Sequence, residues 1–210
     1  MSSTTDKVAE ALYLSGCLRF GNFKLKSGAI SPYYIDLARL LAAPKQLCTI
    51  ADAAAEQAKK IVSVNDINKL ASIELKGALI VPSIACKLDL PCIIVRKEEK
   101  AYGVTGRIAG ADVEKGDRIL FFDDVISEGL SKIEGIKPLQ ELGGVANDFL
   151  VVVNREQGGK ENLEKMGFRV HALAKVSDLV RSLCGKYISK EQADEVLAFV
   201  KDLQVVKSTV

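Results

Sequence analysis

Residues 118–131, RILFFDDVISEGLS, decide the fold class of this chain. The first part, RILFF, is typical of a short buried strand, and two acids, Asp123 and Asp124, follow it directly. A loop of hydroxyl and glycine residues then leads into a helix that we predict at 130–142. A buried strand that continues through an acidic end and a short loop into a helix is typical of one unit of a parallel α/β sheet.

The same alternation of strand and helix extends on both sides of this stretch. We predict strands at 69–74, 91–95, 118–122, 148–153 and 169–174, and helices at 78–88, 130–142, 159–166 and 176–184. This order predicts a mostly parallel sheet with helices on both faces. Ligands of such sheets bind at the carboxyl ends of the strands, so we expect functional residues directly after the strands.

The two ends of the chain lie outside this alternation. The N-terminal part predicts a helix from a Thr5 cap to about Ser15, strands near Leu18–Leu25 and Tyr33–Leu37, and a helix from Pro44 to about Ile61. The C-terminal part predicts a helix at 190–203 with Ser189 as its N-cap. The sequence has no internal repeat and no linker, so residues 1–210 are expected to form a single domain.

Composition excludes several classes of protein. Apolar residues make up 48% and charged residues 27%, with a formal net charge of only +2, so nothing global attracts nucleic acid or a membrane surface. No apolar run approaches the roughly 20 residues needed to span a bilayer, and the N-terminus lacks the pattern of a signal peptide. The five cysteines are an odd number without a CxxC pair, which argues against disulfides and zinc. We therefore expect a cytoplasmic protein with reduced thiols, and we give the single histidine, His171, no role.

The acidic strand end and the loop after it suggest a specific chemistry. Carboxylates at a strand end can accept hydrogen bonds from vicinal hydroxyls and attract magnesium. A loop with hydroxyls and free N–H groups at a helix N-terminus can hold a phosphate. The order therefore predicts a site for a ribose that carries phosphate. Two adjacent acids alone would favour a plain acidic strand end before a capped helix, but the complete order makes that the minority interpretation.

Residues 119–131 resemble the signature with which type I phosphoribosyltransferases bind phosphoribosyl pyrophosphate (PRPP), usually DDVITTGGS. The resemblance implies the α/β fold of that family, with a central, mostly parallel sheet flanked by helices and a small N-terminal hood formed mainly by about residues 1–40. It also implies PRPP contacts from Ser127, Gly129 and Ser131.

Two positions depart from the signature. Glu128 replaces a hydroxyl residue, and a carboxylate opposes a bound phosphate unless it points away or meets a cation. Leu130 replaces a small residue and is expected to resist a left-handed backbone there.

Other segments resemble orotate phosphoribosyltransferases. FKLKSG at 23–28 and SPYYID at 31–36 resemble the hood of that family, which implies that Lys26 reaches the reacting ligands and that Tyr33 and Tyr34 border the orotate ring. Without the resemblance, an edge hairpin with exposed lysines is the ordinary interpretation of these residues.

The remaining segments follow predicted strands. VRKEEKAYG at 95–103 resembles the start of a mobile catalytic loop; the alternative is a solvated charge run, but the roughly 20-residue connection that it opens has the length of a lid. VVVNREQGG at 151–159 resembles the element whose arginine, here Arg155, holds the orotate carboxylate, and arginine suits bidentate carboxylate recognition. ELKGALIV at 74–81 lies where relatives bind pyrophosphate, and Lys76 fits that role.

The resemblance implies a reaction of orotate with PRPP that gives orotidine monophosphate and pyrophosphate in pyrimidine synthesis. Magnesium arrives with PRPP, no protein metal ligand is implied, closure of a loop at 97–115 dries the site, and in a homodimer Lys100 crosses to the neighbouring site. The implied catalytic residues are Lys26, Lys100, Asp123 and Asp124; the implied PRPP contacts are Lys76, Arg96, Lys97, Asp123, Asp124, Ser127, Gly129 and Ser131; the implied orotate contacts are Lys26, Tyr33, Tyr34 and Arg155.

Two alternatives stay open on the sequence. A non-catalytic ligand sensor of the same fold is favoured by Glu128, Leu130 and the altered segment at 78–82. A phosphoribosyltransferase for another base is opposed by the combination of Lys26, the two tyrosines and Arg155.

Overall fold

The computed structural model describes residues 3–24, 28–100 and 106–208. Its strands are β1 (Leu18–Lys24), β2 (Ile30–Ile35), β3 (Lys69–Ile73), β4 (Cys92–Lys100), β5 (Gly106–Gly110), β6 (Arg118–Ile126), β7 (Val145–Asn154) and β8 (Arg169–Lys175). Its α-helices are α1 (Thr4–Leu14), α2 (Pro44–Asn65), α3 (Val81–Leu88), α4 (Leu130–Glu141), α5 (Gly159–Lys165), α6 (Val176–Leu183) and α7 (Lys190–Ser208), and two 3-10 helices are η1 (Leu37–Ala42) and η2 (Gly77–Leu79).

The central sheet has the order β5-β4-β3-β6-β7-β8. All neighbouring pairs are parallel except β4 and β5, which are antiparallel at one edge. The prediction of a mostly parallel sheet is therefore confirmed. β6 lies in the interior of the sheet, between β3 and β7. The acids near its carboxyl end therefore lie at the centre of the row formed by the carboxyl ends of the parallel strands.

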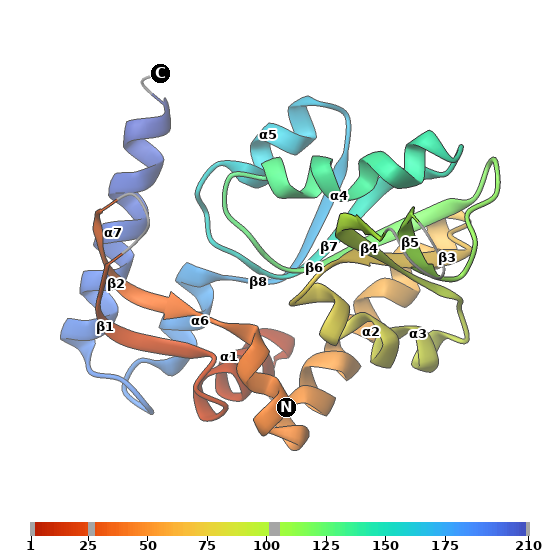
Figure 1. Ribbon diagram of the computed structural model, residues 1–210. Helices are drawn as coiled ribbons and strands as arrows, with labels where there is room; N and C mark the ends of the chain where they lie inside the picture. The colour runs from red at the N-terminus through yellow and green to blue at the C-terminus, as the bar shows by residue number, and fades with distance from the viewer. Residues whose placement is uncertain (1–2, 25–27, 101–105, 209–210) are drawn as a thin grey trace.

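Helices cover both faces of the sheet (Figure 1). On one face, α4 and α5 bury Ile136, Leu139 and Leu163 against Phe121 and Phe149. On the other face, α2 and α3 pack on the alternate side chains of the same strands, because successive strand residues point to opposite faces.

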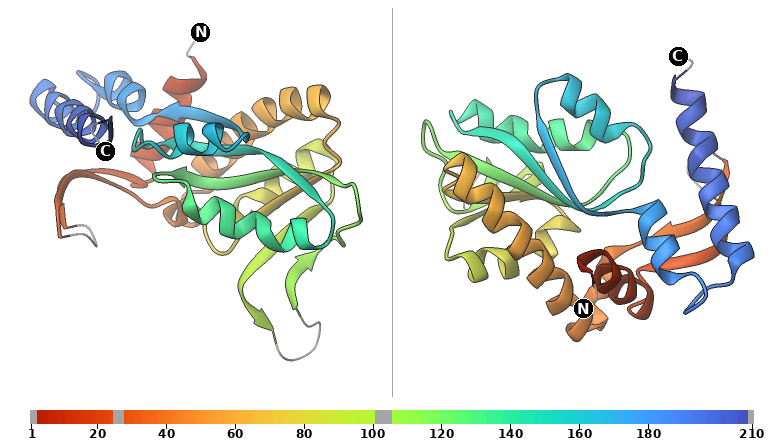
Figure 2. Two further views of the ribbon diagram at one scale, coloured as in Figure 1. Left: turned by 90° about the horizontal axis from the view of Figure 1, so that it is seen from above. Right: turned by 180° about the vertical axis from the view of Figure 1, so that it is seen from behind.

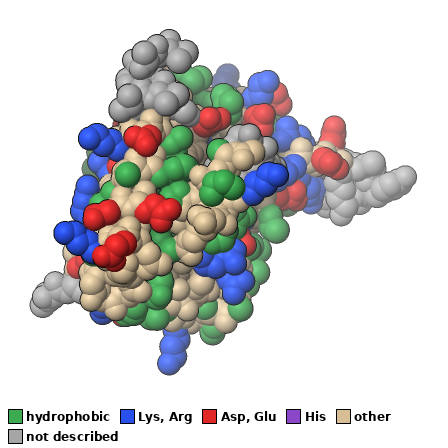
Figure 3. Space-filling view, turned by 90° about the vertical axis from the view of Figure 1, so that its left-hand side faces the viewer, with side chains coloured by type: hydrophobic (Ala, Val, Ile, Leu, Met, Phe, Trp, Pro, Cys, Tyr) green, Lys and Arg blue, Asp and Glu red, His purple; other side chains and the backbone are tan. Residues whose placement is uncertain are grey.

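The hood consists of the antiparallel hairpin β1–β2 with α7 beside it (Figures 1 and 2). Tyr33 of β2 meets Phe199 of α7 edge to face, with ring centroids 6.2 Å apart. The structure therefore adds the C-terminal helix to a hood that we expected mainly from about residues 1–40. Hydrophobic, acidic and basic side chains are intermixed on this side of the molecule (Figure 3).

The connection predicted at 97–115 differs from a plain loop. β4 continues to Lys100 and pairs with β5, which the sequence did not predict, and this hairpin projects from the sheet (Figure 2). The charged run RKEEK does not predict a strand, because an exposed hairpin needs no apolar face. Its backbone is instead held by side chains: Arg96 donates to the Gly106 carbonyl at 3.1 Å, and Arg107 donates to the Arg96 carbonyl at 3.0 Å.

The helix boundaries show smaller differences. Ser3 caps α1 in place of the predicted Thr5, and the helix predicted from 78 begins at Val81 after the short turn η2. Ser189 caps α7 as predicted, since its hydroxyl accepts the Gln192 N–H at 3.2 Å. Among the described helices, none is both long and apolar enough to cross a bilayer.

Candidate active site

The two acids near the carboxyl end of β6 are buried and have different partners. Asp123 is 6% exposed and accepts the Asp124 N–H at 2.9 Å on Oδ1. Asp124 is 7% exposed and accepts the Val125 N–H at 2.8 Å on its own Oδ1. Burial, followed by repulsion from Asp123, raises the pKa of Asp124 to about 6. The structure thus brings the two predicted ribose-binding acids together in an environment that disfavours a second negative charge.

A buried lysine, Lys132, contacts this pair and was missed by the sequence reasoning. It lies in the first turn of α4, is 4% exposed, and donates to Asp123 Oδ2 at 2.5 Å and to the Val125 carbonyl at 2.7 Å. A signal was available in its spacing, because Lys132 falls on the stripe of α4 that also carries the buried Ile136 and Leu139. A lysine on a buried helix stripe requires an anionic partner.

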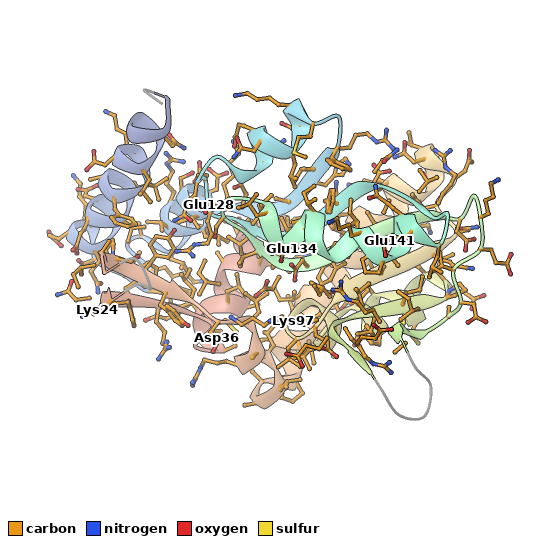
Figure 4. All side chains as sticks on the ribbon, turned by 45° about the horizontal axis from the view of Figure 1, so that its top comes forward. Lys24, Asp36, Lys97, Glu128, Glu134 and Glu141 are labelled. Carbon is orange, nitrogen blue, oxygen red and sulfur yellow. The ribbon has the colours of Figure 1, made fainter. Side chains whose placement is uncertain are left out.

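The segment between β3 and α3 supplies the cation predicted for pyrophosphate. Lys76 Nζ lies 3.2 Å from Asp36 Oδ1 and 3.9 Å from Asp124 Oδ2. Burial acts to lower the pKa of Lys76, but the carboxylates of Asp124 and Asp36 outweigh it and raise that pKa above its ordinary value. Asp36, which follows the hood strand β2 (Figure 4), was not predicted and joins the hood to the sheet edge through Lys76.

Gly77 allows this segment to approach β6 closely. A Cβ at this position would lie 2.2 Å from Ser72 Oγ and 2.7 Å from Asp123 Oδ1. Such distances are below any normal contact, so only glycine fits without movement of the neighbouring groups. Gly77 therefore sets the distance between the segment that carries Lys76 and the acidic pair.

The loop from Ser127 to Gly129 connects β6 to α4. Gly129 has a φ of +90°, and its Cβ position lies 3.0 Å from the Gly159 carbonyl, so a side chain would be both strained and crowded. The Gly159 N–H also donates to the Ser127 carbonyl at 2.9 Å, which fixes the loop against the start of α5.

The two departures from the family signature are accommodated at the surface. Leu130 begins α4 and is 71% exposed, and the left-handed residue of the loop is Gly129, with a φ of +90°, not Leu130. The expectation that Leu130 would strain the loop is therefore wrong. Glu128 is exposed in the same loop (Figure 4).

Arg155 follows β7 and lies beside the same loop. Its Nη1 is 3.5 Å from Ser127 Oγ, its Nε donates to the Tyr33 hydroxyl at 3.4 Å, and its guanidinium stands 5.2 Å from the Tyr33 ring centroid. Tyr33 is fully buried, and burial raises the pKa of its phenol. The structure therefore brings together Arg155 and the loop that follows the acidic pair.

The two predicted orotate-bordering tyrosines point to opposite faces of β2, as consecutive strand residues must. Tyr34 stacks on Phe23 with ring centroids 5.5 Å apart and has the Arg19 guanidinium 5.4 Å from its ring. Tyr33 instead contacts Arg155. The two side chains therefore lie on different sides of the strand, and the expectation that both border the orotate ring stays a prediction.

The hairpin β4–β5 carries the remaining predicted cations. Arg96 is half-buried, whereas Lys97 is exposed and its backbone N–H donates to Glu74 Oε2 at 3.2 Å (Figure 4). Lys26 and the side chain of Lys100 lie outside the described residues. Within the described part of the chain, no cluster of His, Cys, Asp and Glu has the geometry to hold a metal ion.

Comparison with known proteins relates this sequence to one family. The chain is 38% identical to the orotate phosphoribosyltransferase of Pyrococcus horikoshii over 188 residues, which cover 90% of this chain and 98% of that protein. The chain belongs to the orotate phosphoribosyltransferase family. The enzyme of Methanocaldococcus jannaschii is 35% identical over 173 residues, covering 82% of this chain and 95% of that one. No family model matches the sequence.

Solved structures of the same family share the fold. The orotate phosphoribosyltransferase of Aeropyrum pernix is 29% identical, with a TM-score of 0.73 over 84% of this chain and 97% of that chain. The UMP synthase of Leishmania donovani is 33% identical, with a TM-score of 0.82 over 94% of this chain. This chain spans 42% of that longer protein.

Proposed function

We propose that this chain transfers the phosphoribosyl group of PRPP to orotate, giving orotidine monophosphate and pyrophosphate in pyrimidine synthesis. One observation carries the proposal: Arg155 reaches Ser127 in the loop that directly follows Asp123 and Asp124. A guanidinium suited to a carboxylate and a loop suited to a phosphate thus share one site in a member of this family.

PRPP is held at three points. Asp123 and Asp124 accept hydrogen bonds from the ribose hydroxyls, since carboxylate oxygens are strong acceptors. Ser127, Gly129 and Ser131 hold the 5′-phosphate, where the N-terminus of α4 favours negative charge. The exposed position of Glu128 supports an outward orientation that leaves the phosphate position open.

The pyrophosphate of PRPP lies toward Lys76 and the hairpin. Lys76 already stands 3.9 Å from Asp124, so a cation faces the ribose carbon from which pyrophosphate departs. Arg96, Lys97 and Lys100 approach from β4 when the hairpin closes. Magnesium bound with PRPP would offset part of the negative charge of its phosphates.

Orotate lies between the hood and β7. Arg155 binds the carboxylate of orotate with two parallel hydrogen bonds. Tyr33 holds the guanidinium in place through its hydroxyl and its ring. Tyr34 and Lys26 of the hood border the ring. A base without a carboxylate offers no group that Arg155 can bind. Arg155 therefore argues against such a base as the substrate.

The reaction exchanges one bond at the anomeric carbon of the ribose. The bond to pyrophosphate breaks and its electron pair leaves on the pyrophosphate oxygen. The ring nitrogen of orotate forms the new bond and gives up its proton to the departing pyrophosphate. Positive charge develops on the ribose beside Asp124, and negative charge develops beside Lys76. The enzyme lowers the barrier by placing opposite charges at both positions in a site from which closure excludes water.

The proposal extends to the assembly. In a homodimer, Lys100 at the end of β4 crosses to the site of the partner subunit, which the projecting hairpin supports (Figure 2). We further propose one phosphoribosyltransferase domain over residues 1–210, a cytoplasmic location, and no nucleic-acid or membrane partner, which accords with the net charge of +2.

A spectrophotometric assay of orotate consumption with PRPP and magnesium tests the function. The wild type should consume orotate and release pyrophosphate, whereas Asp124→Asn should be strongly impaired. Adenine and uracil in place of orotate test the choice of base. A wild type that binds PRPP but turns over none of the three bases would refute the enzyme and support the ligand-sensor alternative.

A further inference from the structure

We propose that Lys132 is a positioning residue, which holds the Asp123 side chain in a fixed orientation as an acceptor for the ribose of PRPP and connects that acceptor to the start of α4. The inference rests on the proposed PRPP site. It assigns a role to a side chain outside the set that the sequence predicted.

Burying the charge of Lys132 is costly unless the side chain is paired. Lys132 is 4% exposed and Asp123 is 6% exposed, so neither charge is solvated by water. A buried ammonium persists only when it is paired and its hydrogens are bonded. Lys132 meets this requirement with Asp123 Oδ2 at 2.5 Å and the Val125 carbonyl at 2.7 Å, and it passes 3.5 Å from Ser131 Oγ.

Lys132 and its partners lie on two elements of the fold. Asp123 and Val125 belong to the carboxyl end of β6, whereas Lys132 and Ser131 belong to the first turn of α4. The ammonium therefore spans the base of the loop that we assign to the 5′-phosphate. A shift of Lys132 would move the ribose acceptor and the phosphate loop together.

Asp123 and Asp124 differ in their hydrogen-bond and ion-pair partners. Asp123 uses Oδ2 for Lys132 and Oδ1 for the Asp124 N–H, which fixes the orientation of its carboxylate. Asp124 has a more distant cation, Lys76 at 3.9 Å. Lys132 also acts against the rise in the pKa of Asp124 that burial and Asp123 cause. With Lys132 removed, two adjacent carboxylates would face each other with one cation fewer, and the pair would retain a proton near neutral pH.

The test compares Lys132→Met with Lys137→Met, which removes an exposed lysine of the same helix. In Lys132→Met, the acid limb of kcat/KM for PRPP should move to higher pH by about 1–3 units, the size of shift produced by one nearby opposite charge. The KM for orotate should change little, and Lys137→Met should match the wild type. The phosphate of PRPP titrates equally with all variants, so the difference between their profiles belongs to the protein.

A double-mutant cycle with Asp123→Asn separates positioning from simple stabilisation. If Lys132 acts through Asp123, Lys132→Met should impair PRPP use far less in the Asp123→Asn background, where no charge is left unpaired. The neutral double variant also keeps the proposal testable if Lys132→Met alone does not fold. Equal losses in both backgrounds, or an acid limb that does not move in Lys132→Met, would overturn the role of Lys132. A wild type without turnover would instead refute the proposed function. The role of Lys132 can still be tested in that case, because carbon NMR measures the pKa of Asp124 in the free protein. That pKa should rise in Lys132→Met, and an unchanged value would refute the charge coupling.

Discussion

Substitution of Gly77 by alanine should damage PRPP use because it pushes on the acidic pair. The new Cβ would lie 2.2 Å from Ser72 Oγ, 2.7 Å from Asp123 Oδ1 and 3.0 Å from Asp123 Cα. Both neighbours are buried, so neither can swing into solvent. Overpacking of this kind costs about 1–3 kcal/mol of the free energy of unfolding.

The effect on activity should exceed the effect on stability. A displacement of about 1 Å at a substrate-positioning group can cost about 100-fold in rate, so we expect a loss of roughly 10- to 100-fold in kcat/KM for PRPP. Urea denaturation measures the free energy of unfolding, and initial rates at varied PRPP measure kcat/KM.

Two variants serve as controls for Gly77→Ala. Ser72→Ala in the same chain removes the shorter of the two side-chain contacts and should recover part of the stability, by about 0.5–3 kcal/mol of coupling. Gly116→Ala meets nothing within 4 Å but has a φ of +92°, so it should lose stability through backbone strain without loss of PRPP use. If Gly77→Ala keeps wild-type kcat/KM for PRPP, the close approach does not position Asp123 and the reasoning fails.

Four further outcomes are expected. Arg155→Ala should weaken orotate binding by about 1.5–3 kcal/mol in calorimetry and leave PRPP binding nearly intact; unchanged orotate affinity would remove the base site from this position. The pKa of Asp124, about 6 in the folded protein against 3.8 for an unperturbed aspartate, makes its ionised form costly. Its contribution to stability is therefore complete below pH 4 and is lost as pH rises through 6. Asp124→Asn should therefore gain up to about 3 kcal/mol in urea unfolding at pH 8 but not at pH 4, and equal gains at both would contradict this pKa. Glu128→Gln should change PRPP affinity less than about twofold, and tightening of tenfold, or about 1.4 kcal/mol, would show that the carboxylate faces the phosphate. Lys100→Ala mixed with Asp124→Asn should recover activity if subunits share sites, and no recovery with confirmed subunit exchange would place Lys100 within its own site.

The parts of the fold that the sequence predicts are those with an apolar signal. The five parallel strands were found because each carries a short apolar run, which in β6 and β7 is almost continuous, as in ILFF and FLVVV. β5 and the outer half of β4 lack that signal, because an exposed hairpin can be built from charged residues whose stems and guanidinium groups, such as those of Arg96 and Arg107, hold the backbone. The sequence therefore predicts the sheet and misses its polar edge.

The candidate site divides in a similar way. Asp123, Asp124 and Arg155 follow buried strands directly, so the strand pattern alone brings them to one edge of the sheet. Lys132 and Asp36 come from elements whose contacts depend on tertiary packing: one on a helix stripe, the other after the hood hairpin. The strain expected at Leu130 was wrong because the left-handed residue is its neighbour Gly129, and a shift of one position cannot be read from composition.

Under the proposed function, the charges of the site account for a requirement for closure and magnesium. Asp36, Asp123 and Asp124 face Lys76 and Lys132, so among these five side chains, fully ionised, acids outnumber bases by one. Such a cluster suits the hydroxyls and the developing positive charge of the ribose, but it repels the several negative charges of PRPP. The missing positive charge must come from outside the cluster, from magnesium on the substrate and from the cations of β4. Under the proposed function, PRPP binds productively only when the hairpin closes, so chemistry is coupled to the exclusion of water rather than to binding alone.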